Sequence, residues 1–61
     1  EADTGSISCL FSKAGAYEEM GEFEKAIETY QCITDWLTRQ GYDASEHDYP
    51  NRKINELSKK L

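Results

Sequence analysis

Basic residues are scarce in this sequence. Its 61 residues contain seven Lys and Arg against twelve Asp and Glu, which gives a formal net charge of −5. Nucleic acids and anionic membranes both attract Lys and Arg, so this balance argues against either as a partner. The chain also lacks an apolar run of the ~20 residues that a membrane-spanning helix needs. We therefore expect a protein or peptide as the partner, and we favour a cytoplasmic location.

Groups that carry chemistry are equally few. The single histidine, His47, stands between Glu46 and Asp48 in a polar segment, and no nucleophile accompanies it in a recognisable motif. The two cysteines, Cys9 and Cys32, match neither a CxxC motif nor the close ligand pairs of a zinc site. We predict no enzyme, no metal and no cofactor. The cysteines are expected to be reduced and packed as small hydrophobes, with a disulfide between two antiparallel helices as the alternative.

What the sequence does contain is helical periodicity. Apolar residues recur at intervals of three and four, which predicts helices and not strands. Gly21 and Gly41 follow the first two periodic stretches and suit the left-handed position that ends a helix. Pro50 is tolerated in a first helical turn and marks the start of a third helix. The predicted helices span residues 6–20, 22–40 and 50–61.

These lengths predict an all-α fold, in which an antiparallel helical hairpin carries a third short helix. The third helix is too short to be stable alone, so it must lie on the hairpin. The predicted apolar stripe of the third helix is Ile54, Leu57 and Leu61, and that of the first helix extends to Met20. The basic residues of the third helix are expected to complement the acidic hairpin.

Local signals complete the expected helices. Thr4 or Ser6 is a candidate N-cap, and Gly5 with the polar residues before it is expected to fray. Ser45 is a candidate cap for a short turn, and Asp35 and Arg39 form an i,i+4 ion pair.

The centre of the hairpin carries a resemblance to a known family. The residues that carry it are Ala14, Tyr17, Gly21, Phe23, Ala26 and Tyr30. Their spacing resembles the signature of the tetratricopeptide repeat, a 34-residue helix–turn–helix unit. The resemblance implies one helical module over 1–61, with a repeat at 7–40, a connector at 41–49 and a capping helix at 50–61. It also implies the C-terminal part of a larger repeat protein. The three-helix microtubule-interacting-and-transport domain is similar over Lys13-Ala14, Phe23, Ala26 and Tyr30.

The resemblance implies a protein–protein interaction module that binds a peptide or helix on its first-helix face. The residues expected on that face are Ser8, Phe11, Ser12, Gly15, Glu18, Glu19 and Glu22. Phe11 would anchor an apolar side chain and the glutamates would favour a basic partner. The alternatives are that Phe11 packs on the third helix and that the glutamates are solvated.

Trp36 and Tyr42 form a further candidate, a docking patch for another domain or a second copy. The alternative for Trp36 is core packing against Ile54 and Leu57. A structural element that completes its core as a homodimer is therefore the second hypothesis for function.

Overall fold

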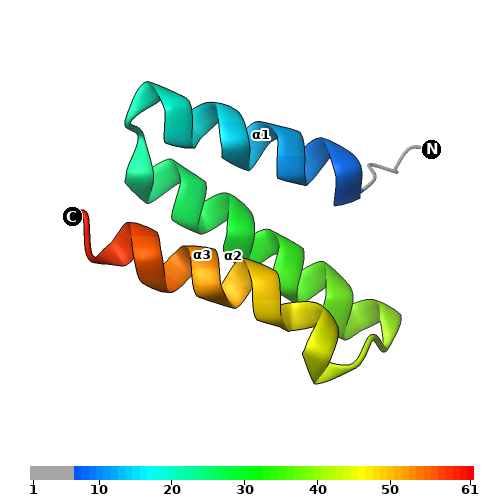
Figure 1. The fold of residues 1–61 in the computed structure, drawn as a ribbon. Helices are drawn as coiled ribbons and strands as arrows, with labels where there is room; N and C mark the ends of the chain where they lie inside the picture. Colours follow the sequence, from blue (N-terminus) through cyan, green and yellow to red (C-terminus); the bar gives the residue numbers. More distant parts are fainter. Residues whose placement is uncertain (1–6) are drawn as a thin grey trace.

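The computed structural model describes residues 7–61, and these form three α-helices and one short 3-10 helix (Figure 1). Helix α1 spans Ile7–Met20 and helix α2 spans Phe23–Gln40. The 3-10 helix η1 spans Ala44–His47, and helix α3 spans Asp48–Ser58. The predicted all-α class, a helical hairpin with a third short helix, is confirmed. The candidate caps Thr4 and Ser6 lie outside the described residues, as does Gly5.

Two glycines end the helices of the hairpin, as predicted. Gly21 and Gly41 have φ angles of +81° and +82°, in the left-handed region. At the end of α2, the Gly41 N–H donates to the Thr38 carbonyl and the Tyr42 N–H to the Leu37 carbonyl. A side chain would cost roughly 1–2 kcal/mol in this conformation, so glycine is the residue that lets each helix stop here.

The third helix begins two residues earlier than predicted, at Asp48. Pro50 is therefore its third residue, where the missing N–H is still tolerated because the first four N–H groups have no partner within the helix. The connector is also more ordered than predicted, because it contains η1. The expectation that Ser45 caps this turn is wrong. Ser45 lies inside η1, which has no side-chain cap.

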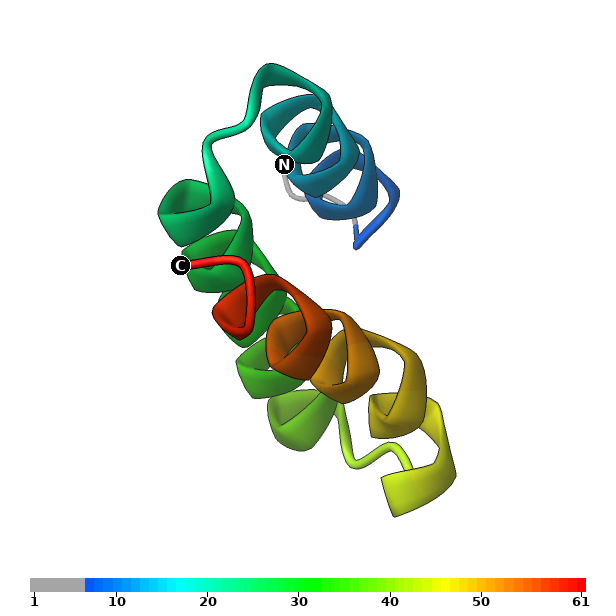
Figure 2. The same ribbon diagram turned by 60° about the vertical axis from the view of Figure 1, so that its left-hand side comes forward.

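The three helices form a flat layer with α2 in the middle (Figures 1 and 2). The Cα positions extend 30 × 25 × 12 Å. Helices α1 and α3 each pack along α2, but no Cα atom of α1 lies within 8 Å of one in α3. The outer helices therefore do not close a bundle around a shared core.

The core lies along both sides of α2. Its buried apolar residues are Ala14 of α1, Ala26, Tyr30, Ile33 and Leu37 of α2, and Leu57 of α3. Both alanines are fully buried, which lets the backbones of α1 and α2 approach closely. Trp36 and Ile54 pack against this core as partly buried residues.

Two residues of the predicted apolar stripes lie outside the core. Met20 is 64% exposed and Leu61 is 67% exposed. Met20 is the last residue of α1, and Leu61 lies beyond the end of α3 at Ser58, so no neighbouring helix covers either. The expected packing of the cysteines is also wrong, since Cys9 and Cys32 are both exposed and free, with no disulfide between them.

Candidate interaction face

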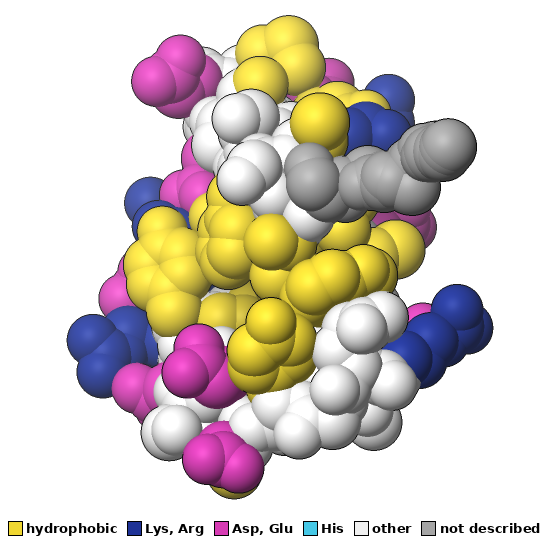
Figure 3. Space-filling view, turned by 90° about the vertical axis from the view of Figure 1, so that its right-hand side faces the viewer, with side chains coloured by type: hydrophobic (Ala, Val, Ile, Leu, Met, Phe, Trp, Pro, Cys, Tyr) yellow, Lys and Arg dark blue, Asp and Glu magenta, His cyan; other side chains and the backbone are white. Residues whose placement is uncertain are grey.

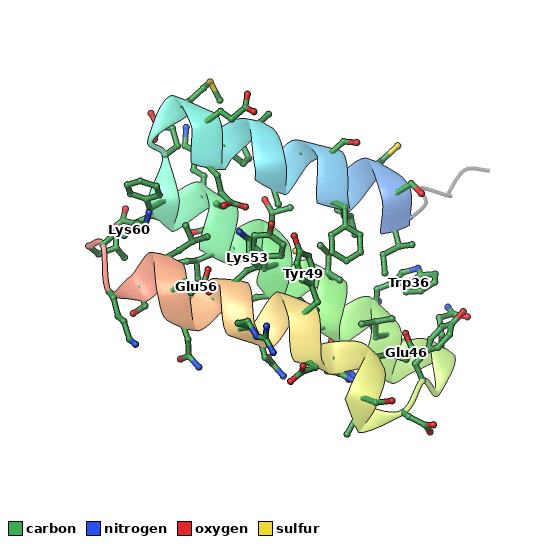
Figure 4. The ribbon with its side chains drawn as sticks, in the orientation of Figure 1. Trp36, Glu46, Tyr49, Lys53, Glu56 and Lys60 are labelled. Atoms are coloured by element: carbon green, nitrogen blue, oxygen red, sulfur yellow. The ribbon has the colours of Figure 1, made fainter. Side chains whose placement is uncertain are left out.

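Three aromatic rings join the three helices. Phe11 of α1 lies 6.3 Å from Tyr30 of α2 and 5.6 Å from Tyr49 of α3, measured between ring centroids. Tyr30 and Tyr49 are 6.3 Å apart at an interplanar angle of 81°. Edge-to-face contacts of this kind contribute roughly 0.5–1.5 kcal/mol each beyond the buried area. Tyr49 is half-exposed and extends from α3 toward α1 (Figure 4).

An ionic contact bridges the outer helices beside these rings. The Lys53 ammonium of α3 lies 3.0 Å from one carboxylate oxygen of Glu18 on α1. The Tyr30 hydroxyl donates to the other Glu18 oxygen at 2.6 Å. The Glu18 and Lys53 side chains are only 22% and 23% exposed. The expectation that the basic third helix complements the acidic hairpin is confirmed by this contact.

The three groups shift one another's pKa values. Partial burial tends to raise the pKa of the Glu18 carboxyl, but the hydrogen bonds from Tyr30 and Lys53 outweigh it and lower the pKa. The hydrogen bond to Glu18 raises the pKa of Lys53. Burial, together with the bond to Glu18, raises the pKa of the Tyr30 phenol. Near neutral pH, Glu18 is therefore charged, Lys53 is charged, and Tyr30 keeps the proton that it donates.

The residues predicted for the first-helix face divide into two groups. Phe11, Gly15 and Glu18 are half-buried along the edge of α1 that faces α3. The other four predicted residues are exposed, and they are Ser8, Ser12, Glu19 and Glu22. A Cβ atom added to Gly15 would meet no atom within 4 Å, so this edge of α1 is open between Phe11 and Glu18. We call the surface formed by Phe11, Gly15, Glu18, Tyr49 and Lys53, with the buried Tyr30 ring beneath it, the α1–α3 face.

Sequence reasoning missed the contribution of α3 to this face. Tyr49 was placed in the connector, and Lys53 was treated only as part of a basic tail. The four-residue spacing of Tyr49 and Lys53 would have put both on one side of a helix, provided that the helix began before Pro50.

Trp36 and Tyr42 lie together at one end of the layer. Their rings stack with centroids 5.8 Å apart and an interplanar angle of 23°. Trp36 is partly buried against the core, whereas Tyr42 is half-exposed. Figure 3 views the end where α1 begins and α2 ends, and it shows hydrophobic side chains gathered across the middle of this end. The Trp36 ring thus belongs partly to the core and partly to this surface.

His47 has a local structural role. Its Nδ1 lies 2.8 Å from the Asp43 carbonyl oxygen, and its Nε2 lies 3.1 Å from the Thr38 hydroxyl of α2. The neighbouring Asp48 carboxylate lies 3.5 Å from the Arg52 guanidinium. The contact with Thr38 ties η1 to the end of α2, whereas the Asp48–Arg52 pair lies within α3. Within residues 7–61, no three side chains of the metal-binding types cluster as ligands.

A groove runs between α1 and α2, with a volume of about 290 Å³. Its lining residues are Leu10, Lys13 and Tyr17 of α1 and Lys25, Glu28, Thr29 and Cys32 of α2. The Lys25 ammonium lies 5.9 Å from the centroid of the Tyr17 ring. Within the described residues, neither Lys13 nor Lys25 forms an ion pair. The lining of this groove therefore carries two ammonium groups, those of Lys13 and Lys25, and one carboxylate, that of Glu28.

Comparisons with protein-family models, with curated proteins and with solved structures found no match to this chain. Among the described helices, none combines the length and the apolar character required to cross a membrane.

Proposed function

We propose that this chain is a protein–protein interaction module of tetratricopeptide-repeat type that binds a peptide or helix on its α1–α3 face. The observation that carries the proposal is the spacing of the outer helices. Helices α1 and α3 flank α2 without packing on each other, and side chains alone bridge them, through Phe11 with Tyr49 and Glu18 with Lys53. Such a surface presents aromatic and charged side chains above the buried Tyr30 of α2.

The flat layer also supports the tetratricopeptide resemblance over its alternative. Ala14 and Ala26, two small residues of the repeat signature, are fully buried where α1 meets α2. In a closed three-helix bundle, the third helix would pack against the first as well as the second. Here no Cα atom of α3 lies within 8 Å of one in α1, and only side chains connect the two helices, as expected of a capping helix that covers the outer side of a repeat.

The α1–α3 face favours a partner with an apolar side chain next to a basic one. Half-exposed Tyr49 beside Phe11 offers the apolar contact. Lys53 neutralises Glu18, so the charges left at the edges of the face are three exposed carboxylates, those of Glu19, Glu22 and Glu56, and the exposed ammonium of Lys60, whose charge also acts on Glu18. Carboxylates around an aromatic contact attract Lys or Arg on a partner and repel an acidic one.

The opening at Gly15 provides the test. Peptides selected from a random display library against the wild-type chain would be synthesised, and their affinities measured by titration calorimetry. Gly15→Gln adds a side chain to the α1–α3 face without removing a core contact, so we expect it to weaken the selected peptides at least about tenfold. Ala16→Gln adds the same side chain to the exposed opposite side of α1 and serves as the matched control.

Two results would count against the proposal. Equal affinities for wild-type and Gly15→Gln would show that the peptides bind elsewhere. Selection of acidic peptides in place of apolar–basic ones would contradict the charge argument. Circular dichroism of both variants checks that the helices are intact.

A further inference from the structure

The side of α1 turned away from α3 has no partner among residues 7–61. Cys9, Lys13, Ala16 and Met20 follow one another at intervals of four, three and four residues, so they share one side of the helix. All four are exposed. We call these residues the outer stripe. It runs beside the groove between α1 and α2, and its Lys13 lies on the rim of that groove.

Met20 is the residue of the outer stripe that most needs an explanation. It is an apolar side chain with 64% of its surface exposed to water. Its neighbour Glu19 is exposed and, within the described residues, forms no ion pair. At the other end of the Lys13–Met20 segment of this stripe, Lys13 stands beside a groove whose exposed lining is mostly apolar, and within the described residues it also forms no ion pair. One end of this segment thus carries an apolar residue with a free carboxylate, and the other carries a groove with a free ammonium.

These two ends are complementary, and one chain contains both. We propose that a second copy of this chain binds the outer stripe, with the two α1 helices antiparallel and Met20 of each copy in the groove of the other. A two-fold axis between Ala16 and Tyr17 places Met20 of one copy level with Lys13 of its partner, because both lie 3.5 residues from the axis, about 5 Å along the helix. Glu19 of each copy then lies beside Lys13 of the other.

The residue at the axis fits this arrangement. Two α1 helices come closest to each other where they cross the two-fold axis, and a small side chain there allows close approach. Ala16 is the outer-stripe residue nearest to the axis. Each copy carries a net charge of −5, so long-range repulsion opposes association and the dimer should be weak. The outer stripe is on the opposite side of α1 from Phe11 and Glu18, so the proposal does not depend on peptide binding to the α1–α3 face; Glu19 alone borders both surfaces.

Charge exchange tests the proposed pairing. Sedimentation equilibrium of the wild-type chain from about 10 µM to about 1 mM covers the range expected for a weak dimer. Lys13→Glu and Glu19→Lys should each weaken dimerisation roughly tenfold, because a threefold effect acts at two symmetric contacts. The double variant restores the pair with opposite polarity, and its dimerisation should return to within about twofold of the wild type.

Met20 is tested against an equally exposed residue. Met20→Ser should weaken dimerisation at least about tenfold, because it removes an apolar side chain from two grooves at once. Leu61→Ser removes a side chain of nearly equal exposure, 67% against 64%, from the C-terminus beyond α3, outside the outer stripe, and should leave dimerisation unchanged. Circular dichroism confirms that each variant is folded, which is expected because every substituted side chain is exposed.

A second measurement tests the register of the dimer. In a chain with Cys9→Ser and Cys32→Ser, a cysteine at Ala16 lies near its symmetry mate and should form an intermolecular disulfide under mild oxidation. A cysteine at exposed Asn55 of α3 is the control and should not. Monomers at every concentration would overturn the proposal. A dimer that is insensitive to Met20→Ser and to the charge exchange would overturn it as well, and so would a monomeric chain that binds a synthetic peptide of residues 17–23 in the groove.

Discussion

The ion pair between α1 and α3 allows the sharpest test of how this fold is stabilised. Glu18→Gln keeps the size of the side chain and an oxygen that accepts the Tyr30 hydroxyl, but it removes the charge that faces Lys53. Fully exposed ion pairs contribute about 0.2–1 kcal/mol, and hydrogen bonds to charged groups contribute about 1.5–3 kcal/mol. The Glu18 and Lys53 side chains are 22% and 23% exposed, so the contribution of this pair should lie between these two ranges. We expect Glu18→Gln to lower the free energy of unfolding by about 1 kcal/mol.

A double-mutant cycle isolates the pair from the rest of the structure. Urea unfolding of the wild type, Glu18→Gln, Lys53→Met and the double variant, followed by far-ultraviolet circular dichroism, should give a coupling energy of about 1 kcal/mol. Asp35 and Arg39 provide the control, since their side chains are 3.3 Å apart but 63% and 76% exposed. Their coupling should not exceed about 0.5 kcal/mol. A coupling for Glu18 and Lys53 no larger than that of the control would refute the reasoning.

The same ion pair predicts how the stability of the fold depends on pH. Folding lowers the pKa of Glu18, so the unfolded chain takes up its proton first and the carboxylate stabilises the fold only above the ordinary pKa of 4.5. That contribution is lost as the pH falls through the lower pKa of the folded state. The difference in stability between wild type and Glu18→Gln should therefore be constant near neutral pH and shrink below 4.5. A difference that persists unchanged in strong acid would contradict the assignment.

Further substitutions test the backbone and the core. Gly15→Ala should raise the free energy of unfolding by about 0.5–1 kcal/mol in urea titrations, because the added methyl meets no atom and stiffens a helix interior. Gly41→Ala should lower it by roughly 1–2 kcal/mol, since alanine must adopt a φ of +82°. Ile33→Ala should cost about 2–5 kcal/mol and leave little folded protein by circular dichroism. Tyr42→Ala should change the fluorescence of Trp36 and cost about 0.5–1.5 kcal/mol, because it removes the stacked ring.

The helices could be predicted from the sequence because their signals are local. The three-and-four spacing of apolar residues fixed the type of each element, and Gly21 and Gly41 fixed two of the ends through their backbone freedom. The start of α3 was harder to predict, because Pro50 is compatible with any position in the first turn. Met20 and Leu61 fit the apolar periodicity but lie where no second helix extends, and periodicity alone says nothing about where a neighbour ends.

The candidate face was only half predictable for a related reason. The tetratricopeptide resemblance implies Phe11, Gly15 and Glu18 on the first-helix face, but the contacts of Phe11 and Glu18 with α3 come from residues that are distant in sequence. Glu18 looked like one solvated carboxylate among several. Its pairing with Lys53 and Tyr30 depends on the packing of all three helices, and no local pattern encodes that.

The distribution of the core explains why α1 is the helix best placed to bind partners. Helix α2 contributes five buried residues, whereas α1 contributes one, Ala14. Helix α2 is covered by α1 on one side and by α3 on the other, so it contributes most of the buried contacts. Helix α1 packs along α2 on one side only, and two of its other sides are exposed. An element with few buried contacts opens at low free energy, so α1 should exchange its amide hydrogens faster than α2. A ligand on either side of α1 would slow that exchange, because binding adds contacts that this helix lacks among the described residues.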